Sequence, residues 1–166
     1  MYDSSIAPIS HSLKALAAIL KKAEAYCEAK KIDPNALLTA RLFPDMLPLA
    51  RQVQIATDQA KGCGARLTGI AVPSYPDEEK TFAELQARIA KTLDFVGGLR
   101  KEQFADAAKR IVTLKIGGKD MEFDGTTYLT NAVLPNFYFH VTTAYNILRH
   151  NGLAIGKGDF LGRNLS

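Results

Sequence analysis

The sequence has no tryptophan and only two cysteines, Cys27 and Cys63. They lie on separate predicted helices without Cys-x-x-Cys spacing, which argues against both a disulfide framework and a structural zinc knot. The first twelve residues lack the basic start of a secretion signal, and Pro8 and Ser10 interrupt any apolar run long enough for export. We therefore expect a protein of the reducing cytoplasm.

The sequence also lacks a compact basic stripe interleaved with stacking aromatic residues. The formal net charge is +4 and the isoelectric point is near 9.1. However, the basic residues mostly alternate with acidic ones, as in Lys21-Lys22-Ala23-Glu24, which is typical of solvated helix faces. We expect neither a nucleic acid nor a membrane as a partner.

Hydrophobic residues make up 47% of the 166 residues and charged residues 23%, a composition typical of globular proteins. A chain of this length corresponds to about one domain and can bury close to 70% of the surface that the unfolded chain exposes. The sequence therefore predicts a single domain that spans residues 1–166.

Apolar residues recur at three- and four-residue intervals along most of the chain, which predicts amphipathic helices. The predicted helices cover residues 9–31, a short piece at 35–41, 45–69, 81–97 and a last segment that ends at Asn151-Gly152. Asp45 is expected to cap the third of these helices, with Pro48 in its first turn. Thr81 and Glu84 match a capping box, and Pro135 predicts a kink in the last helix.

Two segments break the helical periodicity. Residues 70–80 contain two prolines and predict an extended linker that is long enough to run the length of a bundle. Residues 111–123 alternate in polarity around Gly117-Gly118, which predicts a β-hairpin, and residues 153–166 are expected to be irregular. The sequence therefore predicts an all-α four-helix bundle with a small β-hairpin inserted before the last helix.

Several motifs of known chemistry are missing from the sequence. No glutamate precedes any of the three histidines by three residues, as a di-iron bundle requires. The His-Glu-x-x-His pattern of zinc proteases is missing, and Gly117-Gly118-Lys119 lacks the flanking residues of a phosphate-binding loop. These absences exclude the three corresponding kinds of site.

Three side chains leave alternatives open. His140, one helical turn after Asn136, is either a neutral core histidine with hydrogen-bond partners or a metal ligand. Cys63 is either a buried, inert thiol or a reactive one activated by a neighbouring cation. Asp58 could act as a general base if it were desolvated, but an aspartate at such a position on a helix more often faces solvent. We assign Asp58 no catalytic role.

Three stretches of the sequence resemble a known family: PLARQVQIATDQAKG, VTLKIGGKDMEFDG and FHVTTAYNILRHNG. They look like the DinB/YfiT-like superfamily and, within it, a bacterial branch catalogued as a domain of unknown function. The likeness extends over nearly the whole chain, as far as Gly162. The resemblance implies a four-helix bundle with an up-down-down-up connection, often dimeric, in which three histidines bind a divalent metal such as zinc or nickel.

The resemblance places the three metal ligands at Gln59, Asn136 and His140, so a single imidazole remains. Amide oxygens are weak partners for zinc compared with imidazole or thiolate. We therefore expect a degenerate pocket and no cofactor, with a zinc or nickel ion at His140 as the alternative. Related members include thiol-dependent transferases, in which a metal-activated thiolate attacks an electrophile.

Three functions remain open on the sequence alone. The leading hypothesis is a small-molecule-binding or stress-associated module, a homodimer whose pocket contains Gln59, Asn136 and His140, with Cys63 as a further candidate. The first alternative is a metal-dependent (thiol) transferase or hydrolase that uses His140, with Cys63, Asp58 or Asn136 completing a weak site. The second alternative is a structural dimerisation domain without pocket chemistry.

Overall fold

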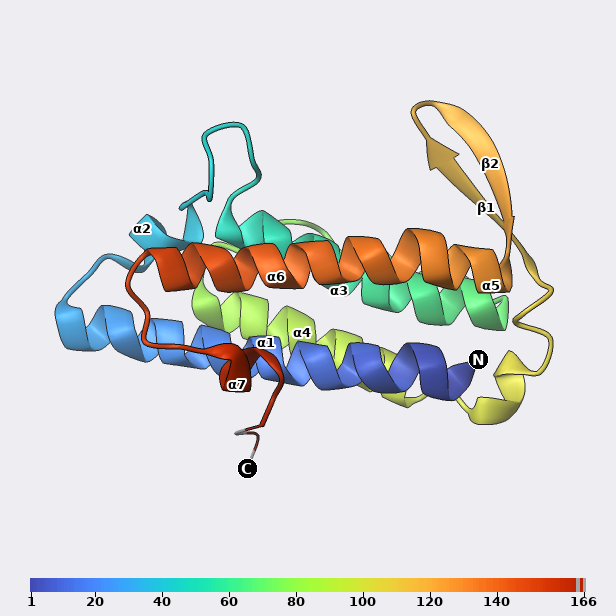
Figure 1. The fold of residues 1–166 in the computed structure, drawn as a ribbon, viewed down its shortest axis with the longest axis horizontal. Coiled ribbons are helices and arrows are strands. Elements are labelled where there is room, and N and C mark those ends of the chain that lie inside the picture. The colour runs from blue at the N-terminus through green and yellow to red at the C-terminus, as the bar shows by residue number, and fades with distance from the viewer. Residues whose placement is uncertain (164, 166) are drawn as a thin grey trace.

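The computed structural model describes residues 1–163 and 165, and its long helices form a four-helix bundle (Figure 1). These helices are α1 (Tyr2–Lys30), α3 (Leu49–Thr68), α4 (Phe82–Gly97) and α6 (Leu134–His150). Helices α3 and α4 run in one direction, and α1 and α6 run in the other (Figure 1). The predicted all-α class and the up-down-down-up connection are therefore confirmed.

The apolar stripes of the four helices meet in one continuous core. Its fully buried members include Leu13, Leu16, Leu20, Val53, Leu85, Phe137 and Ile147. Among the residues that the structure describes, no helix combines the length and the apolar character needed to cross a membrane.

Helix α1 begins at Tyr2, well before the predicted start near Ile9, although Pro8 lies inside it. Proline removes one backbone hydrogen bond from a helix, but packing stabilises the extra turns here. Ile6 is buried, and the ring of Tyr2 packs edge-on against Phe104 with centroids 5.3 Å apart. Tertiary contacts therefore extend the helix beyond the point where the sequence pattern alone placed its start.

Side chains cap the starts of two helices. The side chain of Asp33 accepts a hydrogen bond from the backbone N–H of Asn35 at the start of the short helix α2 (Pro34–Leu38). At the start of α4, Thr81 Oγ1 accepts from Glu84 N, and Glu84 Oε2 accepts from Thr81 N. This reciprocal pair is the capping box that the sequence predicted.

The expectation that Asp45 caps the second long helix is wrong. Residues 39–48 form an irregular loop, and α3 begins at Leu49 with Pro48 as its N-cap residue. A proline disfavours helical backbone angles in the residue before it, so the turn before Pro48 does not close. The loop is fastened to the helix by a 3.0 Å hydrogen bond from Leu49 N to Ala40 O.

Because α3 and α4 are parallel, the chain must return along the bundle between them. Residues 70–80 make this return as an extended crossover, as predicted (Figure 1). After α4, the 3-10 helix η1 (Lys101–Phe104) leads into a two-stranded antiparallel sheet of β1 (Ile111–Ile116) and β2 (Lys119–Asp124).

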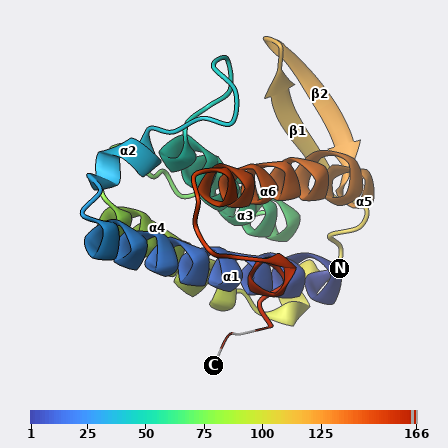
Figure 2. The same ribbon diagram turned by 60° about the vertical axis from the view of Figure 1, so that its left-hand side comes forward.

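The predicted β-hairpin is confirmed, and it projects from one end of the bundle (Figures 1 and 2). Gly117 and Gly118 form its turn with φ angles of 58° and 81°, left-handed values that glycine adopts without strain. Val112 lies opposite Phe123 in the register. Val112 is buried, and Leu114 and Phe123 pack against the core, so the base of the hairpin is anchored to the helices.

The last helix begins irregularly. The short helix α5 (Gly125–Thr127) is followed by a π-helical segment, η2 (Tyr128–Val133), which leads directly into α6. Pro135 has no N–H to donate to the carbonyl group of Asn131, one helical turn earlier. The irregularity expected at Pro135 therefore takes the form of a widened turn just before it.

The expectation that residues 153–166 are irregular is wrong in part. The short helix α7 (Lys157–Phe160) lies across α1 (Figure 2). Lys22 Nζ forms an ion pair of 2.6 Å with Asp159, and Nε2 of His11 donates to the carbonyl oxygen of Leu161 at 2.9 Å. Long-range contacts of this kind leave no periodic signal in so short a segment.

Candidate functional site

A cavity of about 610 Å³ lies between the hairpin and the helices α3 and α6. Its lining residues are Gln59, Arg66, Thr113, Leu114, Lys115, Ile116, Phe123, Tyr128, Asn131, Ala132 and Asn136. They come from α3, both strands, the π-helical segment and the first turn of α6. The hairpin therefore forms one wall of this cavity, and the helices form the other.

The π-helical segment supplies three of the lining residues, namely Tyr128, Asn131 and Ala132. A π turn carries more residues than an α turn, so it changes which side chains share a face of the helix. Such turns occur frequently at functional sites. Pro135 therefore shapes the cavity indirectly, through the turn that precedes it.

Arg66 is placed in the cavity by the glycine one turn before it. A β-carbon on Gly62 would collide with Nη1 of Arg66, so the arginine side chain folds back over the space that the glycine leaves. Nη1 donates to the hydroxyl oxygen of Tyr128 at 3.3 Å. The contact orients the guanidinium, and burial raises the pKa of Tyr128, so this hydroxyl stays protonated at neutral pH.

The charges in the cavity are of one sign. Arg66 and Lys115 line it, while none of the described lining residues is an aspartate or a glutamate. Within the described part of the chain, neither cation lies within 4.0 Å of a carboxylate, and the side chains of Gln59 and Asn136 have no hydrogen-bond partner in the protein. The cavity therefore offers cationic and amide groups that remain available to a ligand.

His140 is not among the residues that line this cavity. It lies against the start of α3, where its Nδ1 is 2.7 Å from Oε1 of Gln52. The amide nitrogen of Gln52 donates to the carbonyl oxygen of Leu47 at 2.9 Å, which fixes the orientation of the amide. Oε1 therefore faces the histidine, and Nδ1 of His140 carries the hydrogen.

The imidazole of His140 is held in its neutral form. Burial lowers its pKa from 6.5, and the positive charge of Arg51 lowers it further. His140 is 8% exposed. The arrangement matches the core-histidine alternative, in which a buried neutral ring has a hydrogen-bond partner.

Cys63 does not line the cavity either, and it is fully buried in the core behind the lining residues Arg66 and Tyr128. Burial raises the pKa of its thiol to about 12, which outweighs the opposing effect of Arg66. The thiolate is the nucleophilic form of cysteine, so this side chain is inert at neutral pH. Of the four candidate residues, Gln59 and Asn136 line the cavity together, whereas His140 and Cys63 do not line it.

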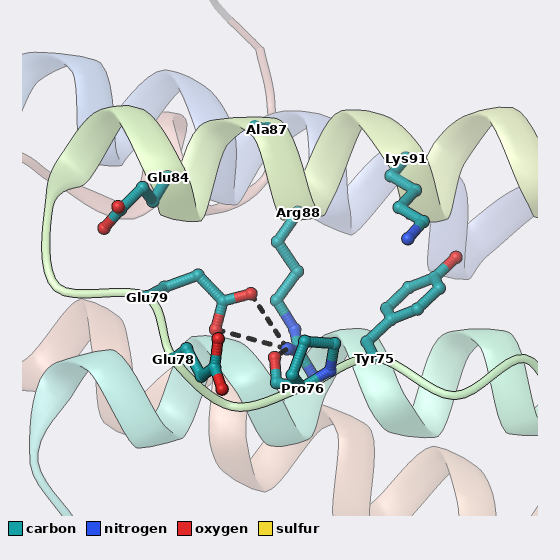
Figure 3. Close-up of a pocket in the computed structure, with 8 residues that line it drawn as sticks. All are labelled: Tyr75, Pro76, Glu78, Glu79, Glu84, Ala87, Arg88 and Lys91. Carbon is teal, nitrogen blue, oxygen red and sulfur yellow. Dashed lines mark hydrogen bonds and ion pairs between the residues drawn. The ribbon is translucent and has the colours of Figure 1, made fainter.

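A second, smaller cavity of about 330 Å³ lies between the crossover and α4 (Figure 3). Its central residue is Arg88, which is buried and donates to Thr57 Oγ1 at 2.7 Å. The guanidinium forms ion pairs with Asp58 at 2.8 Å, Asp77 at 3.0 Å and Glu79 at 3.0 Å. We call Arg88 and these three carboxylates the Arg88 cluster; it ties α3 and the crossover to α4.

Several charged groups around this smaller cavity are paired with one another or lie against an aromatic ring. The ring of Tyr75 has Lys61 and Lys91 at 4.1 Å and 4.3 Å from its centroid, contacts that suit a cation over an aromatic ring. Asp58 is paired with Lys61 at 2.7 Å as well as with Arg88. Asp58 is therefore an ion-pair partner, and the residues around this cavity hold the crossover against α3 and α4.

The residues do not fit the three-histidine metal site that the resemblance implies. At the three corresponding positions, Gln59 and Asn136 present amides, and Nδ1 of His140 is engaged with Gln52. In the described part of the chain, no three side chains of histidine, cysteine, aspartate or glutamate lie close enough to share a metal ion. The expected lack of a high-affinity metal stays a prediction.

A family model for a domain of unknown function, DUF1993, matches residues 1–161. The chain belongs to the DUF1993 family. No curated protein matches it. A crystal structure described as a DinB family member from Shewanella denitrificans is 45% identical to this DUF1993 chain, with a TM-score of 0.88. The match covers 97% of the DUF1993 chain and 91% of the other, which confirms the resemblance and the bundle fold.

Several residues of the DUF1993 site were missed by sequence reasoning. The sequence pattern gives Arg66, Lys115 and Gln52 no role in a site. Spacing along α3 offers one usable signal, because Gln52 and Gln59 are two turns apart on one face. The contribution of the hairpin had no local signal, since it depends on how the strands pack against the helices.

Proposed function

We propose that this DUF1993 protein is a small-molecule-binding module whose ligand occupies the cavity between the hairpin, α3 and α6. The cavity of about 610 Å³ carries the proposal, because ligand pockets typically measure about 300–1,000 Å³ and combine apolar walls with a few convergent polar groups. Gln59 and Asn136 supply such groups from two facing helices.

The composition of the walls supports binding over catalysis. Among the described lining residues there is no histidine, cysteine, aspartate or glutamate. A nucleophile with an adjacent base, or a carboxylate pair, is what acyl transfer, hydrolysis and proton abstraction usually require. The amide side chains instead suit recognition, since they donate and accept hydrogen bonds without changing charge.

A ligand screen with a blocked cavity tests the proposal. Asn136 and Thr142 are both exposed residues of α6, but only Asn136 is among the cavity's lining residues. We expect compounds that raise the melting temperature of the wild type to raise that of Thr142→Trp equally. They should have little or no effect on Asn136→Trp, whose indole obstructs the cavity. Equal stabilisation of both variants would place the ligand elsewhere and refute the proposal.

Metal titration addresses the alternative of a metal-dependent transferase or hydrolase at His140. With Nδ1 protonated and facing Gln52, the ring retains one nitrogen for a metal, and a single imidazole binds zinc weakly. We expect no stoichiometric zinc or nickel binding by calorimetry. Tight binding that disappears in His140→Ala would favour the metal-dependent enzyme.

A further inference from the structure

The clearest chemical signal in the cavity is Arg66, whose surroundings differ from those of Arg88 in the smaller cavity. Arg88 has three carboxylates within 3.0 Å, so its charge is neutralised inside the fold. In the described part of the chain, the guanidinium of Arg66 has the hydroxyl of Tyr128 as its side-chain partner and no carboxylate. A guanidinium has five N–H donors arranged to match an anionic oxygen pair, so Arg66 is oriented but not neutralised.

A second cation reinforces this signal from a different element. Lys115 of β1 lines the same cavity, is exposed, and has no ion-pair partner among the residues the structure describes. Two positive charges that share a cavity repel each other unless an anion lies between them. The walls therefore favour a negatively charged occupant. Because Arg66 is partly buried, its attraction to an anion is stronger than it would be in open solvent.

The rest of the wall is apolar. Leu114, Ile116 and Phe123 of the hairpin and Ala132 of the π-helical segment line the cavity. Such a surface is not needed to hold a bare inorganic anion, whereas it can bury the hydrocarbon part of an organic one. The amides of Gln59 and Asn136 lie on the helical wall and can bind further polar groups.

We propose that the ligand is an organic anion whose headgroup is bound by Arg66 and Lys115 and whose apolar body lies against the hairpin. The inference rests on the proposed function, since it names the chemical class that the same cavity takes. Carboxylates probe the whole site, and inorganic phosphate distinguishes recognition of the headgroup alone from recognition of the whole molecule.

The test compares matched probes by NMR titration of the labelled full-length chain. Octanoate and octanamide share a hydrocarbon chain and differ in charge, as do 3-phenylpropanoate and 3-phenylpropanamide. We expect the carboxylates to shift cavity resonances and to bind about tenfold more tightly than their amides, the effect of one charge-assisted contact. Phosphate alone should bind more weakly than either carboxylate.

Substitutions of Arg66 and Lys115 test whether these two cations cause the preference for carboxylates over amides. Arg66→Gln and Lys115→Gln should each weaken carboxylate binding by about three- to tenfold and weaken amide binding by a smaller factor. Lys115 is exposed on the hairpin, so its variant keeps the bundle intact even if Arg66→Gln lowers stability. Arg163→Gln and Lys14→Gln remove the same charges from exposed positions outside the cavity and should bind every probe like the wild type.

The outcomes separate the two proposals. If the amides shift the cavity resonances and bind as tightly as the carboxylates, the anion inference is overturned while the binding function survives. If phosphate binds as tightly as the carboxylates, the organic part of the inference is overturned. If no probe shifts a cavity resonance at millimolar concentration, both the binding function and the anion inference are rejected.

Discussion

His140 is held by a chain of two hydrogen bonds that begins at a backbone carbonyl. Leu47 fixes the amide of Gln52, and Gln52 fixes the tautomer of the imidazole. The contact joins α6 to the start of α3, where the loop 39–48 ends. A proton added to the ring would have to be accommodated among buried neighbours and near Arg51, which disfavours the charged form.

The free energy of unfolding should therefore depend on the protonation of His140. Its pKa in the folded protein is below the ordinary value of 6.5, so the unfolded chain takes up more protons in this range. Stability is then fully present above about pH 6.5 and is lost as the pH falls toward the lowered folded pKa. We expect urea unfolding at about pH 8 and about pH 5.5 to show a larger loss for the wild type than for His140→Gln.

The comparison variant for this experiment is His150→Gln, which removes an exposed imidazole from the end of the same helix. Because both variants lose one histidine, the difference between them isolates the buried ring. A pH profile of His140→Gln that coincides with that of the wild type would show that the ring does not couple folding to protonation.

At the residue scale, the sequence allowed the core role of His140 but did not name its partner. The resemblance directed attention to Gln59, one of two glutamines on the same face of α3. Which of them reaches the histidine depends on the axial position of α6 against α3, and a helical pattern carries no information about that position. The sequence also did not show that Arg66 lacks an ion-pair partner, because this depends on which carboxylates the fold brings near it.

At the element scale, helix α3 contains two glycines with different neighbours. A β-carbon on Gly64 would lie 2.6 Å from Cδ1 of Leu99 and close to Ile6 and Val96, all parts of the packed core. A close approach of helices is thus found at Gly64. A β-carbon on Gly62 would meet the flexible end of Arg66, which can move.

Alanine substitutions should separate these two roles. Overpacking a core costs about 1–3 kcal/mol, so Gly64→Ala should lower the free energy of unfolding in urea. Gly62→Ala should be neutral or slightly stabilising, because alanine favours a helix over glycine by up to about 1 kcal/mol. Each variant serves as the control for the other. Equal stability of the two proteins would contradict the packing account.

The Arg88 cluster joins three elements and should be important for their association. Removing one partner of a buried ion pair leaves uncompensated charges and typically costs about 3–5 kcal/mol. Since Asp58 and Asp77 are partly exposed, we expect Arg88→Met to lower the free energy of unfolding by about 2–4 kcal/mol. Urea denaturation measures this change directly.

The matched control is the exposed ion pair of Lys101 with Asp3, which also joins residues far apart in the sequence. Both of its side chains are mostly in solvent, so Lys101→Met should leave the denaturation midpoint unchanged. A loss for Arg88→Met no larger than that for Lys101→Met would mean that the cluster does not hold the crossover.

Most elements of the fold could be predicted because their signals are local. The capping box of Thr81 and Glu84 and the two turn glycines each act within a few residues. The start of α1 and the helix α7 could not be predicted, because distant packing decides them. The start of α3 was placed too early, because Pro48 disfavours helical angles in the residue before it. The π-helical segment had a local cause in Pro135, but its geometry depends on how the helix around it is held.

At the scale of the whole molecule, several large apolar side chains remain on the surface of the single chain. Phe43 of the loop before α3 is 63% exposed and Phe139 of α6 is 54% exposed, and large exposed apolar side chains that gather into a patch often mark association surfaces. We therefore propose that the protein is a homodimer. Light scattering should give twice the chain mass of 18.1 kDa, and a mass that equals one chain at micromolar concentration would refute this.

The extended crossover is a place where the backbone can be cut without separating the two halves of the molecule. Ala71 and Val72 are exposed. Arg88, which follows them in the chain, forms an ion pair with Asp58, which precedes them. A protease that nicks the backbone at this point would yield two fragments, each with two bundle helices, that stay associated through the core. Co-expressed as separate polypeptides, the two pieces could reassemble by complementation, with the cavity entirely rebuilt from segments of both.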